Sequence, residues 1–226
     1  MSILGTIATS ADAGGHTSTL LLVLGLAGTF AFGLSGGLAG VHAGFDLFGI
    51  VVLAFVVALA GGILRDLLIG VVPQTFRDWR YLAAAGAAGV VCIAFPRQVQ
   101  YAQPGILQVA DALGLSLFCV TGATAALSDG VGVVQATIVG AITAIGGGMI
   151  RDVLLREVPE VLRQDLYAIP ALLGASIVAI AASAGSPSGA YALLGAGACF
   201  SIRMLSLRYG LRLPKRTGGR PSNDRR

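Results

Sequence analysis

Two motifs place an arginine and an aspartate side by side inside apolar sequence. AGGILRDLLIGVVP covers residues 60–73 and GGGMIRDVLLREVP covers residues 146–159. In both, a glycine cluster precedes the Arg-Asp pair and a proline follows seven residues after the aspartate. Ionisable residues inside apolar segments usually face a bundle interior or an aqueous cavity and mark a pathway. These residues therefore indicate a path through which a polar solute passes.

The glycine clusters, Gly61–Gly62 and Gly146–Gly147–Gly148, predict weak points in helices. Each glycine costs a helix about 1 kcal/mol relative to alanine. We expect a kink that faces a wet cavity, where loosened carbonyl oxygens could bind a passing alkali cation and the second half-helix presents its positive end. The alternative is that the glycines only let helices cross closely, which is our interpretation of the glycines in SGGLAG, residues 35–40.

The charged pairs, Arg65–Asp66 and Arg151–Asp152, also have two interpretations. Adjacent helical residues point about 100° apart, so we expect one member of each pair to face the path and the other a partner helix. An arginine repels cations, and its expected role in a cation pathway is a barrier or latch. Alternatively, a long arginine near a helix end could extend to the membrane interface.

The composition predicts a membrane protein. Hydrophobic residues make up 55% of the chain and charged residues only 12%, against about 25% charged residues in ordinary soluble domains. Runs of about 20 apolar residues, the length that spans a bilayer, occur seven times. They cover residues 19–41, 46–71, 80–96, 106–127, 131–155, 167–184 and 189–208. The fold class is all-α, a polytopic membrane protein with seven transmembrane helices.

An internal repeat relates the two motifs. A shift of 86 residues superposes Arg65 on Arg151 and Asp66 on Asp152. It also pairs Phe32 with Phe118, Gly36 with Gly122, Gly44 with Gly130, Pro73 with Pro159, Arg77 with Arg163 and Tyr81 with Tyr167. Each repeat has three spans, so the second copy enters the membrane from the opposite side, an arrangement in which transport pathways form between the halves. The motifs then lie toward opposite faces, which argues against a direct bridge from Arg65 to Asp152.

These spans define the expected domains. A membrane domain at residues 19–208 contains repeat one at about 19–96, repeat two at about 106–184 and a seventh helix at about 189–208. Short-loop Lys and Arg place the C-terminus inside and the N-terminus outside. Residues 1–18 then form a short outer N-terminus and residues 209–226 a basic, disordered cytoplasmic tail that could also attract anionic lipid headgroups.

Small residues suggest how helices pack. Gly33, Gly37, Gly40 and Gly44 form one stripe on the first span, and Thr121, Gly122, Ala125, Ala126 and Gly130 form a surface on the fourth. Such surfaces let helices pack closely. We expect one of them to serve the contact between the repeats.

The remaining polar residues give no sign of an enzyme, a metal site, a cofactor or a nucleic-acid partner. His16 and His42 are isolated from any nucleophile, and Asp111 and Asp129 lie near the ends of the fourth span, where interfacial solvation is the ordinary explanation. A place in a vestibule is the alternative for Asp111. Cys92, Cys119 and Cys199 are expected to be small buried hydrophobes.

The paired motifs, the inverted three-helix repeats and the seventh helix resemble the prokaryotic branch of the trimeric intracellular cation (TRIC) channels over residues 19–208. The resemblance implies a homotrimer in the prokaryotic inner membrane, with one pore per protomer lined by kinked second and fifth helices and permeable to potassium and less so to sodium. It implies the pore residues Gly61, Gly62, Arg65, Asp66, Gly146, Gly147, Gly148, Arg151 and Asp152. Because Ala60 stands where the second cluster has a glycine, the first kink should be milder. The alternative is a secondary transporter for a small zwitterion such as glycine, since inverted repeats suit a carrier equally.

Overall fold

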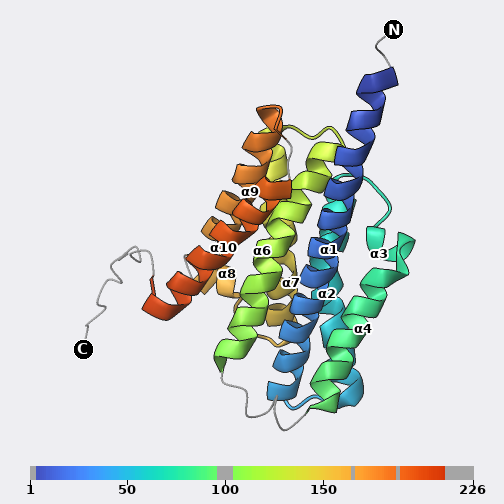
Figure 1. The fold of residues 1–226 in the computed structure, drawn as a ribbon. Helices are drawn as coiled ribbons and strands as arrows, with labels where there is room; N and C mark the ends of the chain where they lie inside the picture. Colours follow the sequence, from blue (N-terminus) through green and yellow to red (C-terminus); the bar gives the residue numbers. More distant parts are fainter. Residues whose placement is uncertain (1–3, 96–103, 164–165, 187–188, 212–226) are drawn as a thin grey trace, which may run out of the picture.

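The protein is a bundle of long helices (Figure 1). The computed structural model describes residues 4–95, 104–163, 166–186 and 189–211. The helices in these ranges are α1 (Leu4–His42), α2 (Leu47–Leu68), α3 (Gln74–Arg77), α4 (Trp79–Ala94), α6 (Pro104–Ser128), α7 (Val133–Leu154), α8 (Glu160–Arg163), α9 (Ala168–Ser183) and α10 (Gly189–Tyr209). Within them, five segments are long and apolar enough to cross a membrane, and α4 and α9 are shorter apolar helices of 16 residues each. The all-α membrane fold is confirmed, and each of the seven expected spans coincides with one of these helices.

The ends of the chain differ in part from the expected boundaries. Helix α1 begins at Leu4, well before the expected start at residue 19, although its apolar membrane-length segment does begin at Thr19. At the other end, α10 stops at Tyr209. The expected tail at residues 209–226 lies almost entirely outside the described residues.

The 86-residue repeat is visible in the helix boundaries themselves. The same shift carries both ends of α2 onto those of α7, both ends of α3 onto those of α8, and the last residue of α1 onto that of α6. In Figure 1, α1 descends from the N-terminal end while its neighbour α6 ascends, so equivalent helices run in opposite directions. The repeats are therefore inverted, as expected. Helix α10 stands outside the repeat and packs on α9 and α6.

The α2 and α7 helices end in the same way in both repeats. After α2, Gly70 has a φ of 78°, and its N–H donates to the Leu67 carbonyl at 3.2 Å. After α7, Arg156 takes the equivalent position with a φ of 59° and donates to the Val153 carbonyl at 3.0 Å. Glycine adopts this left-handed conformation without the steric cost that a side chain imposes. The left-handed residue therefore costs more conformational free energy in the second repeat, where it is Arg156, than in the first, where it is Gly70.

The contact between the repeats is built around two phenylalanines. Phe32 and Phe118 are equivalent residues whose rings meet edge to face, with centroids 5.1 Å apart. Each ring lies over a glycine of the other repeat: a Cβ atom at Gly114 would lie 2.6 Å from Phe32, and one at Gly28 would lie 2.6 Å from Phe118. This reciprocal contact joins α1 to α6.

The glycine stripe of the first span packs within its own repeat, whereas Thr121 and Ala125 of the fourth-span surface line a cavity together with Gly62 and Arg65 of the first repeat. A Cβ atom at Gly33 would lie 2.7 Å from Ala88, and one at Gly37 would lie 2.5 Å from Cys92, both on α4. A Cβ atom at Gly122 would lie 2.7 Å from Thr143 of α7. These glycines therefore pack helices within each repeat, and a role of the fourth-span surface in the contact between repeats stays a prediction.

The glycine clusters do not interrupt their helices, contrary to expectation. The α-helix runs unbroken through Gly61–Gly62 in α2 and through Gly146–Gly148 in α7. The glycines instead let these helices cross in backbone contact. A Cβ atom at Gly61 would collide with the Thr143 carbonyl oxygen, and one at Gly147 would lie 2.7 Å from the Val57 carbonyl oxygen. Close helix crossing, the alternative interpretation, therefore explains Gly61 and Gly147. It does not explain Gly62, where an added Cβ atom would have no neighbouring atom within 4 Å.

Candidate ion pathway

Both Arg-Asp pairs are buried at the carboxyl-terminal ends of α2 and α7. Arg65 and Asp66 are 9% and 3% exposed, and Arg151 and Asp152 are 3% and 4% exposed. An arginine that extended to the membrane interface would keep its guanidinium in water. The burial instead requires each charge to be compensated by neighbouring polar groups.

Within each pair, the two side chains turn toward each other. Arg65 Nε donates to Asp66 Oδ1 at 2.6 Å, and Arg151 Nε donates to Asp152 Oδ1 at 2.9 Å. The members of a pair are therefore in contact with each other, and which of them faces an ion path stays a prediction. The 100° between their Cα–Cβ directions is overcome because the arginine side chain is long enough to fold back along the helix.

The aspartates also hold the short helices that follow. Asp66 Oδ2 accepts the Gln74 backbone N–H at 2.7 Å, and Asp152 Oδ2 accepts the Glu160 backbone N–H at 2.8 Å. Gln74 and Glu160 are equivalent positions at the starts of α3 and α8. Each aspartate thus uses one oxygen for its arginine and the other for the backbone, which fixes the loop after the spanning helix.

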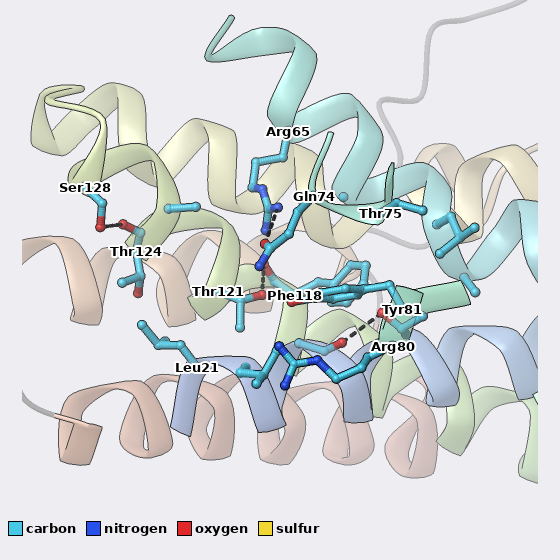
Figure 2. Close-up of a pocket in the computed structure, with 17 residues that line it drawn as sticks. Leu21, Arg65, Gln74, Thr75, Arg80, Tyr81, Phe118, Thr121, Thr124 and Ser128 are labelled. Atoms are coloured by element: carbon cyan, nitrogen blue, oxygen red, sulfur yellow. Dashed lines mark hydrogen bonds between the residues drawn. The ribbon is translucent and has the colours of Figure 1, made fainter. Parts of the chain in front are cut away.

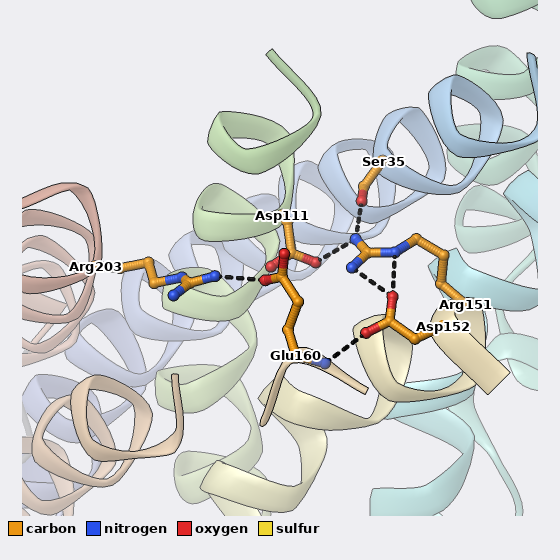
Figure 3. A network of polar contacts seen from close by, with 6 residues as sticks. All are labelled: Ser35, Asp111, Arg151, Asp152, Glu160 and Arg203. Atoms are coloured by element: carbon orange, nitrogen blue, oxygen red, sulfur yellow. Dashed lines mark hydrogen bonds and ion pairs between the residues drawn. The ribbon is translucent and has the colours of Figure 1, made fainter. Parts of the chain in front are cut away.

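The second Arg-Asp site, at Arg151 and Asp152, recruits partners from two other helices (Figure 3). Arg151 Nη1 donates to Asp111 Oδ1 of α6 at 2.7 Å and to Ser35 Oγ of α1 at 2.6 Å. Asp111 is only 1% exposed. The interfacial solvation expected for Asp111 is therefore wrong, since this aspartate is a buried counter-ion. As the geometry of the inverted repeat suggested, neither arginine is paired with the aspartate of the other motif.

The seventh apolar helix, α10, reaches the same site through Arg203. This fully buried arginine donates from Nη2 to Glu160 Oε2 at 2.6 Å, and its guanidinium carbon lies 4.5 Å from the centre of the Tyr167 ring. Burial, followed by the negative charge of Asp111, raises the pKa of Glu160 above its usual range. The chain of contacts Arg203–Glu160–Asp152 links α10 to the end of α7.

The first Arg-Asp site, at Arg65 and Asp66, adjoins a cavity of about 310 Å³ (Figure 2). Arg65 lines this cavity and donates from Nη2 to Gln74 Oε1 at 3.4 Å, a weak contact. Gly62, Arg80 and Tyr81 also line it, together with hydroxyl groups from Thr29, Thr75, Thr121, Thr124 and Ser128. The polar lining fits a water-filled vestibule.

A separate cavity of about 250 Å³ reaches the second site. Arg151 and Asp152 line it with His42, Glu157 and Glu160, and it shares no lining residue with the cavity at Arg65. The close crossing of Gly61 and Gly147, next to the two phenylalanines, lies between the two sites. Each of the two arginines therefore lines its own cavity.

Sequence reasoning singled out both pairs but missed most of their partners. Ser35, Gln74, Glu160 and Arg203 complete the sites and were not predicted. Tyr167 had been noticed only as a member of the repeat. The signal in the sequence for such a partner is Asp111, because an aspartate inside a membrane span usually marks a functional site. The three cysteines are buried, as expected.

A family model described as a glycine transporter matches the chain twice, at residues 22–97 and 108–183. Both bounds of the second match lie 86 residues after those of the first, so the model corresponds to one repeat. A UPF0126 membrane protein of Streptomyces coelicolor is 49% identical over 204 residues, which cover 89% of this chain and 93% of the relative. A UPF0126 inner membrane protein of Escherichia coli is 34% identical over 197 residues, covering 86% and 95%.

Solved structures share the fold over almost the whole membrane domain. A TRIC trimeric intracellular cation channel orthologue from Rhodobacter sphaeroides matches with a TM-score of 0.80 at 35% identity, covering 85% of this chain and 100% of that one. A prokaryotic TRIC channel whose crystals contained 0.5 M KCl matches with a TM-score of 0.79 at 33% identity, covering 87% and 100%. The structural similarity supports a channel.

Proposed function

Because this chain belongs to the family described as glycine transporters, which includes the UPF0126 membrane proteins, and has the fold of prokaryotic TRIC channels, we propose that it is a monovalent cation channel. It passes potassium and, less readily, sodium. Each protomer has its own pore, lined by α2 and α7 with the pore residues Gly61, Gly62, Arg65, Asp66, Gly146, Gly147, Gly148, Arg151 and Asp152.

The observation that carries this proposal is the pair of buried Arg-Asp sites at opposite ends of one inverted pathway. Each site has its own polar cavity, and the α2–α7 crossing separates them. A path for ions would join the cavities by a small separation of these helices at their glycines. Hydroxyl oxygens of the lining threonines and carbonyl oxygens at the crossing are the ligands that hard alkali cations prefer.

The two arginines have different tasks in this pathway. Arg151 is held by three side chains, Ser35, Asp111 and Asp152, and acts as a latch between α1, α6 and α7. Arg65 has fewer partners, Asp66 and a weak contact to Gln74, and it lines its cavity. Its charge there raises the energy barrier for an entering cation. Release of the latch frees the end of α7 and opens the pathway.

The assembly and orientation follow the resemblance and the charge distribution. The protein forms a homotrimer in the inner membrane, which native mass measurement in detergent tests; monomers alone would contradict it. The N-terminus lies outside and the basic C-terminus in the cytoplasm, next to anionic lipid headgroups. Reporter fusions at each terminus measure on which side of the membrane that terminus lies.

The test is single-channel recording of purified protein in planar bilayers. Discrete potassium currents are expected from wild type. Both Arg65→Ala and Arg151→Ala should alter conductance or open probability, with Arg65→Ala changing the response to blockers from the outer face and Arg151→Ala that from the cytoplasmic face. The matched control is Arg208→Ala, which removes an exposed arginine near the end of α10 and outside both cavities.

Two outcomes count against the proposal. If Arg65→Ala and Arg151→Ala show the same currents and blocker responses as wild type and Arg208→Ala from both faces, the Arg-Asp sites are not part of the pathway. Saturable glycine exchange without unitary currents would establish the alternative, a carrier for a small zwitterion.

A further inference from the structure

The first and second sites are built from equivalent positions, with Gln74 in the first where the second has Glu160, and with one exception beside the arginine itself. The second site brings together Ser35, Asp111, Gly148, Arg151 and Tyr167, and the 86-residue shift relates these to Thr121, Gly25, Gly62, Arg65 and Tyr81, all of which line the cavity of about 310 Å³. Serine and threonine both carry a hydroxyl group. The exception is the aspartate at position 111, whose equivalent is Gly25.

The second site shows what a carboxylate does at this position. Asp111 Oδ1 lies 2.7 Å from Arg151 Nη1, in an ion pair buried from solvent. The absence of a side chain at Gly148 provides room for Tyr167 and Asp111, because a Cβ atom there would collide with Tyr167 Oη and lie 3.0 Å from Asp111 Oδ1. Arginine binds carboxylates through strong, directional, charge-assisted hydrogen bonds.

At the first site the same place is empty of any protein carboxylate. Gly25 has no side chain, and a Cβ atom at Gly62 would have nothing within 4 Å. The guanidinium of Arg65 keeps only its bond to Asp66 and the weak contact to Gln74 among the described residues. Two arginines, Arg65 and Arg80, line the cavity, and none of its lining residues is Asp or Glu; Arg80 is paired with Asp78, which lies outside the lining.

We propose that this cavity binds a small free carboxylate, of the size of acetate or an amino acid, with its carboxylate on Arg65 in the position that Asp111 holds against Arg151. The volume of about 310 Å³ is at the lower end of the range for small-molecule sites. Thr121 and Tyr81 are polar residues of the same lining, and Arg80 adds a second guanidinium, which is paired with Asp78 at 2.7 Å. The bound anion gives Arg65 a second carboxylate besides Asp66, as Asp111 does for Arg151, so it acts as an effector of cation passage and need not itself be carried across.

The experiment is saturation-transfer NMR on purified wild-type protein in detergent and potassium chloride. The probes are acetate, glycine and methylammonium, which separate the carboxylate from the ammonium group. We expect saturable signals from acetate and glycine that compete with each other, and none from methylammonium. Short-chain phosphatidylserine, a lipid that carries a carboxylate, is the fourth probe.

Two variants locate the site. Gly25→Asp supplies the missing carboxylate from the chain itself and should abolish acetate binding. The new Cβ atom would lie 2.8 Å from Tyr81 Oη, the end of a side chain, and the second repeat accommodates an aspartate beside its equivalent tyrosine. Arg65→Gln keeps hydrogen-bonding capacity without charge and should weaken binding at least about tenfold. Arg77→Gln, which changes a nearby exposed arginine outside this cavity, is the control.

Several results would overturn the proposal. These are the lack of saturable acetate and glycine binding, equal binding by Arg65→Gln and wild type, binding of methylammonium alone, and binding of phosphatidylserine without acetate or glycine. Arg65→Gln decides the question if Gly25→Asp does not fold. No current is measured, so the outcome is independent of whether the protein is a channel.

Discussion

At the residue scale, the second site shows how a membrane helix bundle holds a buried guanidinium. Arg151 lies between the carboxylates of Asp111 and Asp152 and also donates to Ser35. Removing one partner of a buried ion pair generally costs about 3–5 kcal/mol, because the remaining charge loses its compensation. The site is therefore a stabilising contact among three helices, and in the proposed pathway it is the point at which α7 would be released.

Asp111→Asn tests both roles. The substitution keeps the shape of the side chain but removes its charge, so we expect a lower free energy of unfolding, by about 3 kcal/mol, and a higher open probability. Thermal unfolding in detergent and single-channel recording measure the two effects. Asp129→Asn, at an exposed position after α6, should change neither. Unchanged stability and gating in Asp111→Asn would contradict the latch.

Glu160 makes stability depend on pH. Its pKa is raised above the usual 4.5 in the folded state by burial. As pH rises above 4.5, the unfolded chain loses this proton before the folded protein does, so ionisation favours unfolding until the folded pKa is passed. The melting temperature of wild type should therefore fall relative to that of Glu160→Gln over this window, as measured by thermal unfolding at a series of pH values. Glu157→Gln, at the neighbouring exposed glutamate, should follow wild type. A constant difference between wild type and Glu160→Gln would show that Glu160 titrates normally.

At the element scale, the crossing of α2 and α7 depends on individual glycines. Gly61 faces the Thr143 carbonyl oxygen, which cannot move without shifting the backbone of α7, whereas Gly62 faces open space. Two adjacent residues of one helix thus have opposite tolerance for a side chain.

Gly61→Ala should destabilise the protein by about 1–3 kcal/mol through overpacking. Gly62→Ala should be neutral or stabilising, by up to about 1 kcal/mol, because alanine favours a helix and meets no neighbour. Denaturant unfolding of the two variants checks the contrast. If both glycines serve mainly as flexible points, as the sequence alone suggested, both substitutions should instead reduce open probability with similar effects on stability.

At the scale of the whole molecule, the two repeats meet through Phe32 and Phe118. Each ring is almost fully buried and lies over a glycine of the other repeat. Because the environments are equivalent, Phe32→Ala and Phe118→Ala should each cost about 3–5 kcal/mol, with similar values in denaturant unfolding. Phe76→Ala, at an exposed residue of α3, is the control. A large difference between the two core variants would show that the symmetry of the backbone does not extend to the energetics.

The sequence by itself determined the membrane environment, the seven spans, the inverted repeat and the location of the two Arg-Asp motifs. These follow from local properties, since hydropathy, segment length and an 86-residue period depend only on the order of residues along the chain. The odd number of spans per repeat then requires inversion, whatever the details of packing.

Only the tertiary structure decided what the glycines and charges contact. Whether Gly61 is a kink or a crossing point depends on the Thr143 carbonyl, which is distant in sequence. Arg151 and Asp111 lie on different helices, and no pattern in the sequence indicates that they meet. Arg203 comes from α10, which has no counterpart in the repeat. The second carboxylate that Arg151 has and Arg65 lacks comes from one position, Asp111 against Gly25, and this difference becomes visible only when packing places that position opposite each arginine. Burial makes such contacts decisive, because a charge in a low-dielectric interior must find its partner wherever in the chain that partner lies.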